Sequence, residues 1–260
     1  MKLLQRVLRY RDLFLVFVLR EFTLRYRYSV VGVAWALLQP LSMMALFTFI
    51  FTYIVHYDIA RGYPKVLFFY SALLPWTFFA SSLNYAVPSL RNHYELITKI
   101  YFPREIIPLS GITTAFIDLL IAGAAFLVMM LLYGVGFTAH LIWLPPLLVL
   151  LVVFTVAVAL LLASLNVYYT DVQLAIRFLV QLWFFASPVL YSIDNVPLKL
   201  KLLLFLNPLT FIIENIRRCT IEGRGVVLWQ FAVVAALIAV FYVLSYRFFI
   251  KTERAFADVI

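Results

Sequence analysis

Long apolar runs divide this chain, and the charged residues lie at the edges of these runs. Charged side chains are absent from residues 28–55, 66–90, 141–170 and 225–246. A water-soluble protein of 260 residues has too little interior to bury runs of this length, whereas a helix that crosses a bilayer requires about 20 apolar residues. The pattern therefore predicts an all-α protein whose helices cross a membrane several times.

Six membrane-spanning helices are expected, with both termini on the same side. We place the spans at about 30–55, 66–88, 106–133, 142–167, 172–192 and 226–248. On the side of the termini there are seven Lys and Arg before the first span, three in 91–105 and three at the C-terminal end. The two loops of the other side contain two and five. Because basic loops are retained in the cytoplasm, both termini are predicted to be cytoplasmic.

The N-terminal segment, residues 1–28, is basic and amphipathic. At about 100° per residue, Val7, Phe14 and Leu15 fall on one apolar face of a helix. The short apolar run 13–19 is followed by basic residues and by no small-residue cleavage site, which argues against a signal peptide. We therefore expect an amphipathic helix on the cytoplasmic surface, then a six-span domain at 29–250 and a cytoplasmic tail at 251–260.

Two connections are too long to be simple turns. Residues 91–105 have helical character that ends at Pro103, on the predicted cytoplasmic side. On the other side, 193–225 contains two short apolar stretches that meet at Asn207–Pro208, and each is too short to cross a bilayer. A re-entrant hairpin of two half-helices at 197–217 fits this pattern, and a helix pair that lies on the outer surface is the alternative.

Composition supports a membrane protein. Hydrophobic residues make up 65% of the chain and charged residues 13%, against roughly 45–50% and 25% in soluble domains. The net charge of +9 is assigned to cytoplasmic loops and anionic lipid head groups rather than to nucleic acid, because no soluble domain is predicted that could present a basic face.

No constellation of residues typical of an enzyme is found. The single cysteine, Cys219, excludes an internal disulfide, and the three histidines have no second ligand at helical spacing. None of the eight glycines opens a phosphate-binding G-x4-G-K-[ST] motif, so any ATP that drives this protein is expected on another chain. We expect no catalytic residue, cofactor site or metal site in this chain.

Two charged residues fall inside predicted spans. Asp118 lies about 18 Å along the third span, where it marks either a transport path or an acid that bonds to a neighbouring helix. Arg177 lies about 9 Å into the fifth span, where it either attracts an anionic head group or anchors the helix at the membrane surface.

Aromatic residues are abundant, with 25 Phe, 16 Tyr and 5 Trp. Tyr and Trp rings can stack on sugars while their polar tips bond to hydroxyl groups, although lipid contact or core packing is the favoured explanation for any single one. The candidates for the lining of a glycan path are Tyr28, Trp35, Tyr70, Trp76, Tyr85, Trp183 and Tyr191.

The order of these features resembles a known family. The motifs are LRYRYSVVGVAWALLQPL at 24–41, LITKIYFPREIIPLSG at 96–111, QLWFFASPVLYSIDNVP at 181–197, NPLTFIIENIRR at 207–218 and FIKTERAFADVI at 249–260. Together they resemble the permease subunit of ABC-2 type polysaccharide exporters, in particular the O-antigen exporter permease, whose relatives move capsule polysaccharide or teichoic acid.

The resemblance implies a homodimer in the bacterial inner membrane, two copies of a separate ATPase subunit that binds ATP and Mg, and a substrate glycan linked to polyprenyl diphosphate. It implies a coupling helix at 91–104 that docks on the ATPase, and outer half-helices that close the channel near Asn207 and Pro208. The coupling residues are Arg91, Tyr94, Glu95, Lys99, Tyr101, Phe102, Pro103 and Arg104. Arginine binds phosphate by forked hydrogen bonds, which makes Arg20, Arg25, Arg27 and Arg177 candidates for the head group.

Other functions remain open at this stage. The chain could instead be a small-molecule or lipid ABC-2 efflux permease, which would need only a modest cavity. A membrane-embedded glycolipid transferase would require clustered acids or histidines, and a purely structural subunit would not need an outer hairpin. In the favoured mechanism, ATP closes the partner dimer, the coupling helices are pushed, and the first and fifth spans separate.

Overall fold

The computed structural model describes residues 2–56, 60, 62–253 and 256, and all regular structure in this part is helical. In chain order the helices are α1 (Lys2–Arg9), α2 (Arg11–Tyr26), α3 (Trp35–Phe49), α4 (Lys65–Asn92), α5 (Tyr94–Lys99), α6 (Ile106–Leu132), α7 (Leu144–Tyr168), α8 (Asp171–Phe185), α9 (Leu198–Phe205), α10 (Pro208–Thr220) and α11 (Leu228–Glu253). The short helical turns are η1 (Gly32–Ala34), η2 (Ile50–Ile54), η3 (Ala139–Trp143) and η4 (Ile193–Asn195). The prediction of an all-α protein is confirmed.

Five helical segments are long and apolar enough to cross a membrane. They are Gly32–Ile54, Lys65–Asn92, Ile106–Leu132, Ala139–Tyr168 and Leu228–Glu253. The sixth expected span, at 172–192, is not among them, because α8 has 15 residues and is therefore about 22 Å long. It ends shortly before Pro188, whose ring disfavours helical backbone at the preceding residue.

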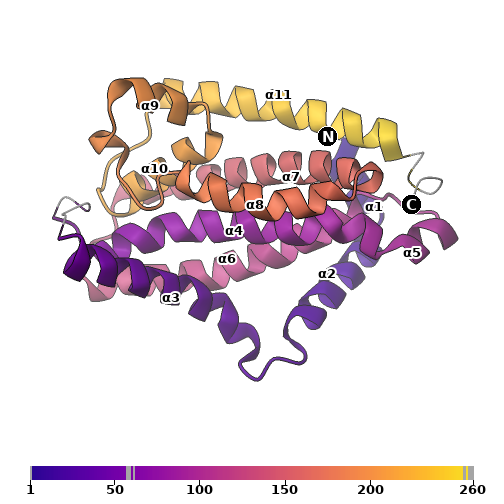
Figure 1. Cartoon of the computed structure of the whole chain (residues 1–260), viewed down its shortest axis with the longest axis horizontal. Coiled ribbons are helices and arrows are strands. Elements are labelled where there is room, and N and C mark those ends of the chain that lie inside the picture. The colour runs from indigo at the N-terminus through magenta and orange to yellow at the C-terminus, as the bar shows by residue number, and fades with distance from the viewer. Residues whose placement is uncertain (1, 57–59, 61, 254–255, 257–260) are drawn as a thin grey trace.

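The core of the bundle lies around α4, which packs against α3, α6, α7, α8 and α10 (Figure 1). Two buried serine side chains on α4 are satisfied within the helix: the Ser71 hydroxyl donates to the Phe68 carbonyl at 2.9 Å, and Ser89 donates to the Ala86 carbonyl at 2.7 Å. Gly111 allows α6 to approach closely, because an added Cβ there would lie 3.2 Å from the Cβ of Tyr85. The bundle is thus close-packed around one buried helix.

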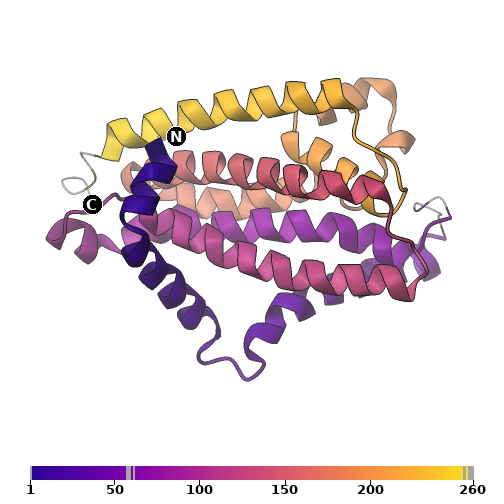
Figure 2. The same cartoon turned by 180° about the vertical axis from the view of Figure 1, so that it is seen from behind.

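The N-terminal segment forms two helices rather than one, with the break at Tyr10. As Figures 1 and 2 show, α2 and α3 diverge from the bundle and are joined by a turn that lies away from it. In both views α1, α5 and the last turn of α11 lie at one end of the bundle, while α9 and α10 lie at the other. The predicted tail at 251–260 falls mostly outside the described residues.

A helical hairpin forms at the end opposite α5. The α9 helix exposes Leu198, Leu200 and Leu203, whereas α10 is buried against α4 and α7. The predicted turn at Asn207–Pro208 is confirmed: Oδ1 of Asn207 accepts a hydrogen bond from the Leu209 N–H at 3.1 Å, and Pro208 is the first residue of α10.

Arg217 on α10 is almost fully buried and holds this hairpin against the bundle. Its guanidinium lies 3.0 Å from the Glu214 carboxylate, donates to the Pro188 carbonyl at 2.9 Å and stacks on the Phe68 ring with 3.8 Å between Cζ and the ring centroid. The side chain therefore joins α10 to α4 and to the chain that follows α8.

Replacing this buried cation is expected to destabilise the protein. Arg217→Gln should lower the free energy of unfolding in detergent by about 3 kcal/mol, because Glu214 would remain buried without its partner. The exposed Arg224 serves as a control, and Arg224→Gln should change the value by less than about 0.5 kcal/mol. Equal stability of the two variants would contradict this role of Arg217.

Candidate functional site

The predicted coupling segment forms the short helix α5 followed by an extended turn. Tyr94, Glu95 and Lys99 are exposed on α5, and Tyr101 is 90% exposed just after it. Ile97 is buried on the opposite face of α5. The segment thus presents polar and aromatic side chains to solvent while its apolar face is fixed to the protein.

The buried face of this segment is held by α2. The ring of Phe17 packs on Phe102 and on His93, with centroid separations of 5.8 and 5.9 Å, and His93 lies 3.4 Å from the Glu21 carboxylate. Arg20, one of the head-group candidates, lines an open groove of about 420 Å³ together with α5 residues. The structure therefore places Arg20 beside the coupling segment and away from the other candidates.

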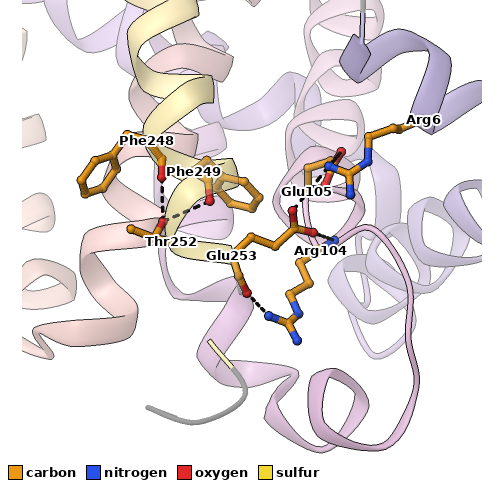
Figure 3. Close-up of polar contacts among 7 residues, drawn as sticks. All are labelled: Arg6, Arg104, Glu105, Phe248, Phe249, Thr252 and Glu253. Carbon is orange, nitrogen blue, oxygen red and sulfur yellow. Dashed lines mark hydrogen bonds and ion pairs between the residues drawn. The ribbon is translucent and has the colours of Figure 1, made fainter. Parts of the chain in front are cut away.

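The end of the coupling segment is attached to α11. Pro103 is buried, and Arg91 is half-buried at the end of α4. The backbone N–H of Arg104 donates to Oε1 of Glu253 at 3.1 Å, and the Arg104 guanidinium donates to the Glu253 carbonyl (Figure 3). Arg104 thus binds within the chain rather than pointing to a partner.

Arg25 lines a second cavity, of about 300 Å³, between α2, α3, α4 and α6. Its guanidinium pairs with Asp118 and stacks on Tyr85 at 3.9 Å, and the hydroxyl of Tyr26 donates to Asp118 at 2.6 Å. Burial, followed by the hydrogen bond to Asp118, raises the pKa of Tyr26 to about 12. Asp118 therefore bonds to a neighbouring helix, which was one of its two interpretations. Trp35 lines the same cavity.

Arg177 lines a larger groove, of about 520 Å³, between α3, α4 and α8. Trp76 and several polar side chains share this groove, and Gln39, Thr77 and Ser81 also line the cavity of Arg25. The groove and the cavity are thus neighbours with a common polar wall. Among the described residues, no acidic side chain pairs with Arg177.

The remaining aromatic candidates lie in different environments. Tyr28 is 86% exposed on the turn after α2, where exposed Arg27 lies 5.6 Å from its ring. Tyr70 is fully buried and donates to the Ala122 carbonyl at 3.3 Å, so it belongs to the protomer core. Trp183 packs on Phe79, and Tyr191 donates to the Phe185 carbonyl at 3.4 Å. The seven candidates do not form one continuous lining within a single protomer.

Sequence reasoning missed the partners of the charged residues. The ion pair between Arg25 and Asp118 joins residues 93 positions apart, and Arg6 meets Glu253 across 247 positions. For the first pair, the only signal in the sequence was an acid inside an apolar helix. Such an acid requires a partner, but the sequence does not indicate which residue it is. For Arg6 and Glu253 the sequence carries no comparable signal, since both lie in charged flanks.

Comparison with known proteins assigns the chain to a family. Residues 12–220 match the ABC-2 type transporter family. The chain is similar to the O-antigen export system permease protein RfbA of Myxococcus xanthus, with 30% identity over 86% of this chain and 85% of that protein. It is 27% identical to RfbA of Klebsiella pneumoniae over 91% and 93% of the two chains, and 24% identical to the polysialic acid transport protein KpsM of Escherichia coli over 79% and 80%.

The family match covers most of the bundle, from α2 to the end of α10, and the relatives align along most of their own length. Within the part of the chain that the structure describes, five helical segments are long and apolar enough to cross a membrane. The chain is therefore a multi-pass membrane protein that belongs to the ABC-2 type transporter family.

Proposed function

We propose that this chain is the permease subunit of an ATP-driven exporter in the bacterial inner membrane, with a polysaccharide linked to polyprenyl diphosphate as its substrate. The observation that carries this proposal is the similarity to O-antigen export permeases along nearly the whole chain. ATP and Mg are bound by a separate ATPase subunit, which docks on the exposed face of α5. The end of the bundle with α1 and α5 then faces the cytoplasm.

Two further features complete the proposed arrangement in the membrane. Apolar side chains such as Phe178 and Leu182 are exposed on α8, which supports α8 with the following residues as a short sixth span. The exposed leucines of α9 and the buried α10 support a hairpin that re-enters the outer leaflet and closes the path at rest. The amphipathic helices α1 and α2 lie at the cytoplasmic surface.

The groove of Arg177 supports a path between two copies of the chain. Gln39, Arg177 and Gln181 line an outward-facing groove on helices that are otherwise apolar. Polar side chains at membrane depth are costly in lipid and face protein or water instead. A second protomer placed over α3 and α8 would enclose this groove, with Trp76 and Arg177 along a glycan path. The cavity of Arg25 shares this polar wall and would admit a charged head group.

Purification of the tagged full-length chain in mild detergent tests the function. We expect a P-loop ATPase subunit in equal amount, ATP hydrolysis, and a polyprenyl diphosphate glycan identified by mass spectrometry. A small apolar compound in place of the glycan would instead indicate an efflux permease. A purified chain with neither ATPase nor glycan would overturn the proposal.

Truncation of Tyr101 is expected to weaken ATPase docking. Exposed aromatic side chains are frequent anchors of interfaces, and the loss of one costs about 2 kcal/mol, or about thirtyfold in affinity. The Tyr101→Ala chain should therefore retain much less ATPase subunit after washing than the wild type. Tyr133→Ala, at the opposite end of α6, is the matched control and should retain the wild-type amount. Full retention by Tyr101→Ala would place the docking surface elsewhere.

Removal of the Arg177 charge is expected to reduce export. Arg177→Gln should lower the rate of glycan export by about tenfold, and Arg177→Lys should recover part of it, because a point charge replaces the forked donor. Lys251→Gln removes an exposed charge at the same end of the bundle and should export normally. The assay measures glycan delivered across the membrane of sealed vesicles, and normal export by Arg177→Gln would refute a substrate contact.

A further inference from the structure

Four charged side chains meet where α1, α6 and α11 come together (Figure 3). Arg6 extends from α1, and its Nη1 atom lies 3.0 Å from Oε1 of Glu105 and 3.4 Å from Oε2 of Glu253. Arg104 and Glu105 directly precede α6, and Glu253 is the last residue of α11. We call these four residues the clasp. The clasp contains two positive and two negative groups, so it is neutral as a whole.

The clasp joins two helix ends of opposite polarity. The N-terminus of α6 carries a partial positive charge, and the Glu253 carboxylate accepts the backbone N–H of Arg104 just before it. The C-terminus of α11 carries a partial negative charge, and the Arg104 guanidinium binds its last carbonyl. Each helix end is therefore stabilised by a charged group from the other.

Arg6 provides the attachment of α1 to this junction. The Glu105 side chain is 0% exposed, and burial raises the pKa of its carboxyl. Burial acts against the charge of Arg6, but the carboxylates of Glu105 and Glu253 outweigh it and raise the Arg6 pKa. The distance to Glu105 is that of an ion pair, although the geometry is not that of a directed hydrogen bond. Without Arg6, a carboxylate would be left buried and unpaired.

The clasp also connects the segment after α5 to α11. Only residues 100–105 separate α5 from α6, and within them Phe102 and Pro103 are buried, which fixes this stretch to the protein. The α11 helix packs along α7 and has many exposed residues elsewhere. A displacement of α5 therefore reaches α11 most directly through Arg104 and Glu253.

We propose that the clasp makes α1, the start of α6 and the end of α11 move as one body when α5 is displaced. Arg6, Arg104, Glu105 and Glu253 are positioning residues in this scheme, because they pass the displacement of α5 on to the helices that they join. The inference rests on the proposed function, since it requires an ATPase that moves α5. It differs from a purely structural role, in which the clasp would only stabilise the fold.

Neutral variants of the clasp separate these two roles. Arg6→Gln, Glu105→Gln and Glu253→Gln are each purified with the ATPase subunit, and both ATP hydrolysis and glycan export are measured. We expect ATP hydrolysis per complex to stay near the wild-type rate while export per ATP falls by about tenfold. The exposed Asp12→Asn is the control, since its carboxylate pairs only with exposed Arg11 among the described residues.

Two results would overturn the proposal. One is normal export per ATP in all three variants, and the other is a loss of export that follows only the loss of folded complex. If the wild type and Asp12→Asn show no ATP-driven export either, the proposed function itself fails, which is a different outcome from failure of the clasp alone.

A covalent bridge provides a second test, independent of ionic chemistry. Arg6→Cys and Glu253→Cys are combined with Glu105→Gln, which removes the buried charge, and with Cys219→Ser, which removes the native thiol. A short bis-methanethiosulfonate reagent then joins α1 to α11. We expect poor export per ATP before bridging, recovery after bridging, and loss again on reduction. Export that remains poor after bridging would refute a rigid link.

Discussion

A charge inside an apolar helical bundle is stable only beside an opposite charge, because neither lipid nor packed side chains replace its hydration. This constraint fixes the positions of several elements of the protein. Asp118 on α6 holds the end of α2 through Arg25, and Glu105 binds α1 through Arg6. Arg217 holds α10 through the Pro188 carbonyl and the Phe68 ring, while its ion pair with Glu214 lies within α10 and balances its charge. In each case the contacts of one buried or partly buried charge attach a helix to the rest of the bundle.

The same constraint argues that one face of the protomer is incomplete. Polar residues line the groove of Arg177 and the neighbouring cavity of Arg25. Lipid would be a poor environment for these side chains, and a second copy of the chain over α3 and α8 would provide a better one.

The sequence was sufficient for the features that depend on local composition. Apolar runs predicted the long helices, and Asn207–Pro208 marked the turn before α10. The helical character expected over residues 91–105 is confined to α5 between the end of α4 and Lys99. The sequence was insufficient where distant residues decide the outcome. The break at Tyr10 and the early end of α8 before Pro188 altered two predicted helices. Tyr70 has the same residue type as Tyr85, yet it is fully buried and donates to the Ala122 carbonyl of α6, whereas Tyr85 is partly exposed and lines the cavity of Arg25.

Helix α2 contacts both the coupling segment and the cavity that Arg25 lines. Near its middle, Phe17 and Glu21 contact the coupling segment and its flank through Phe102 and His93, and at its end Arg25 closes one wall of the 300 Å³ cavity. From Phe17 to Arg25 the helix rises about 12 Å. Both sets of contacts are thus made by one continuous helix, which joins the flank of the coupling segment to the charged wall of the cavity.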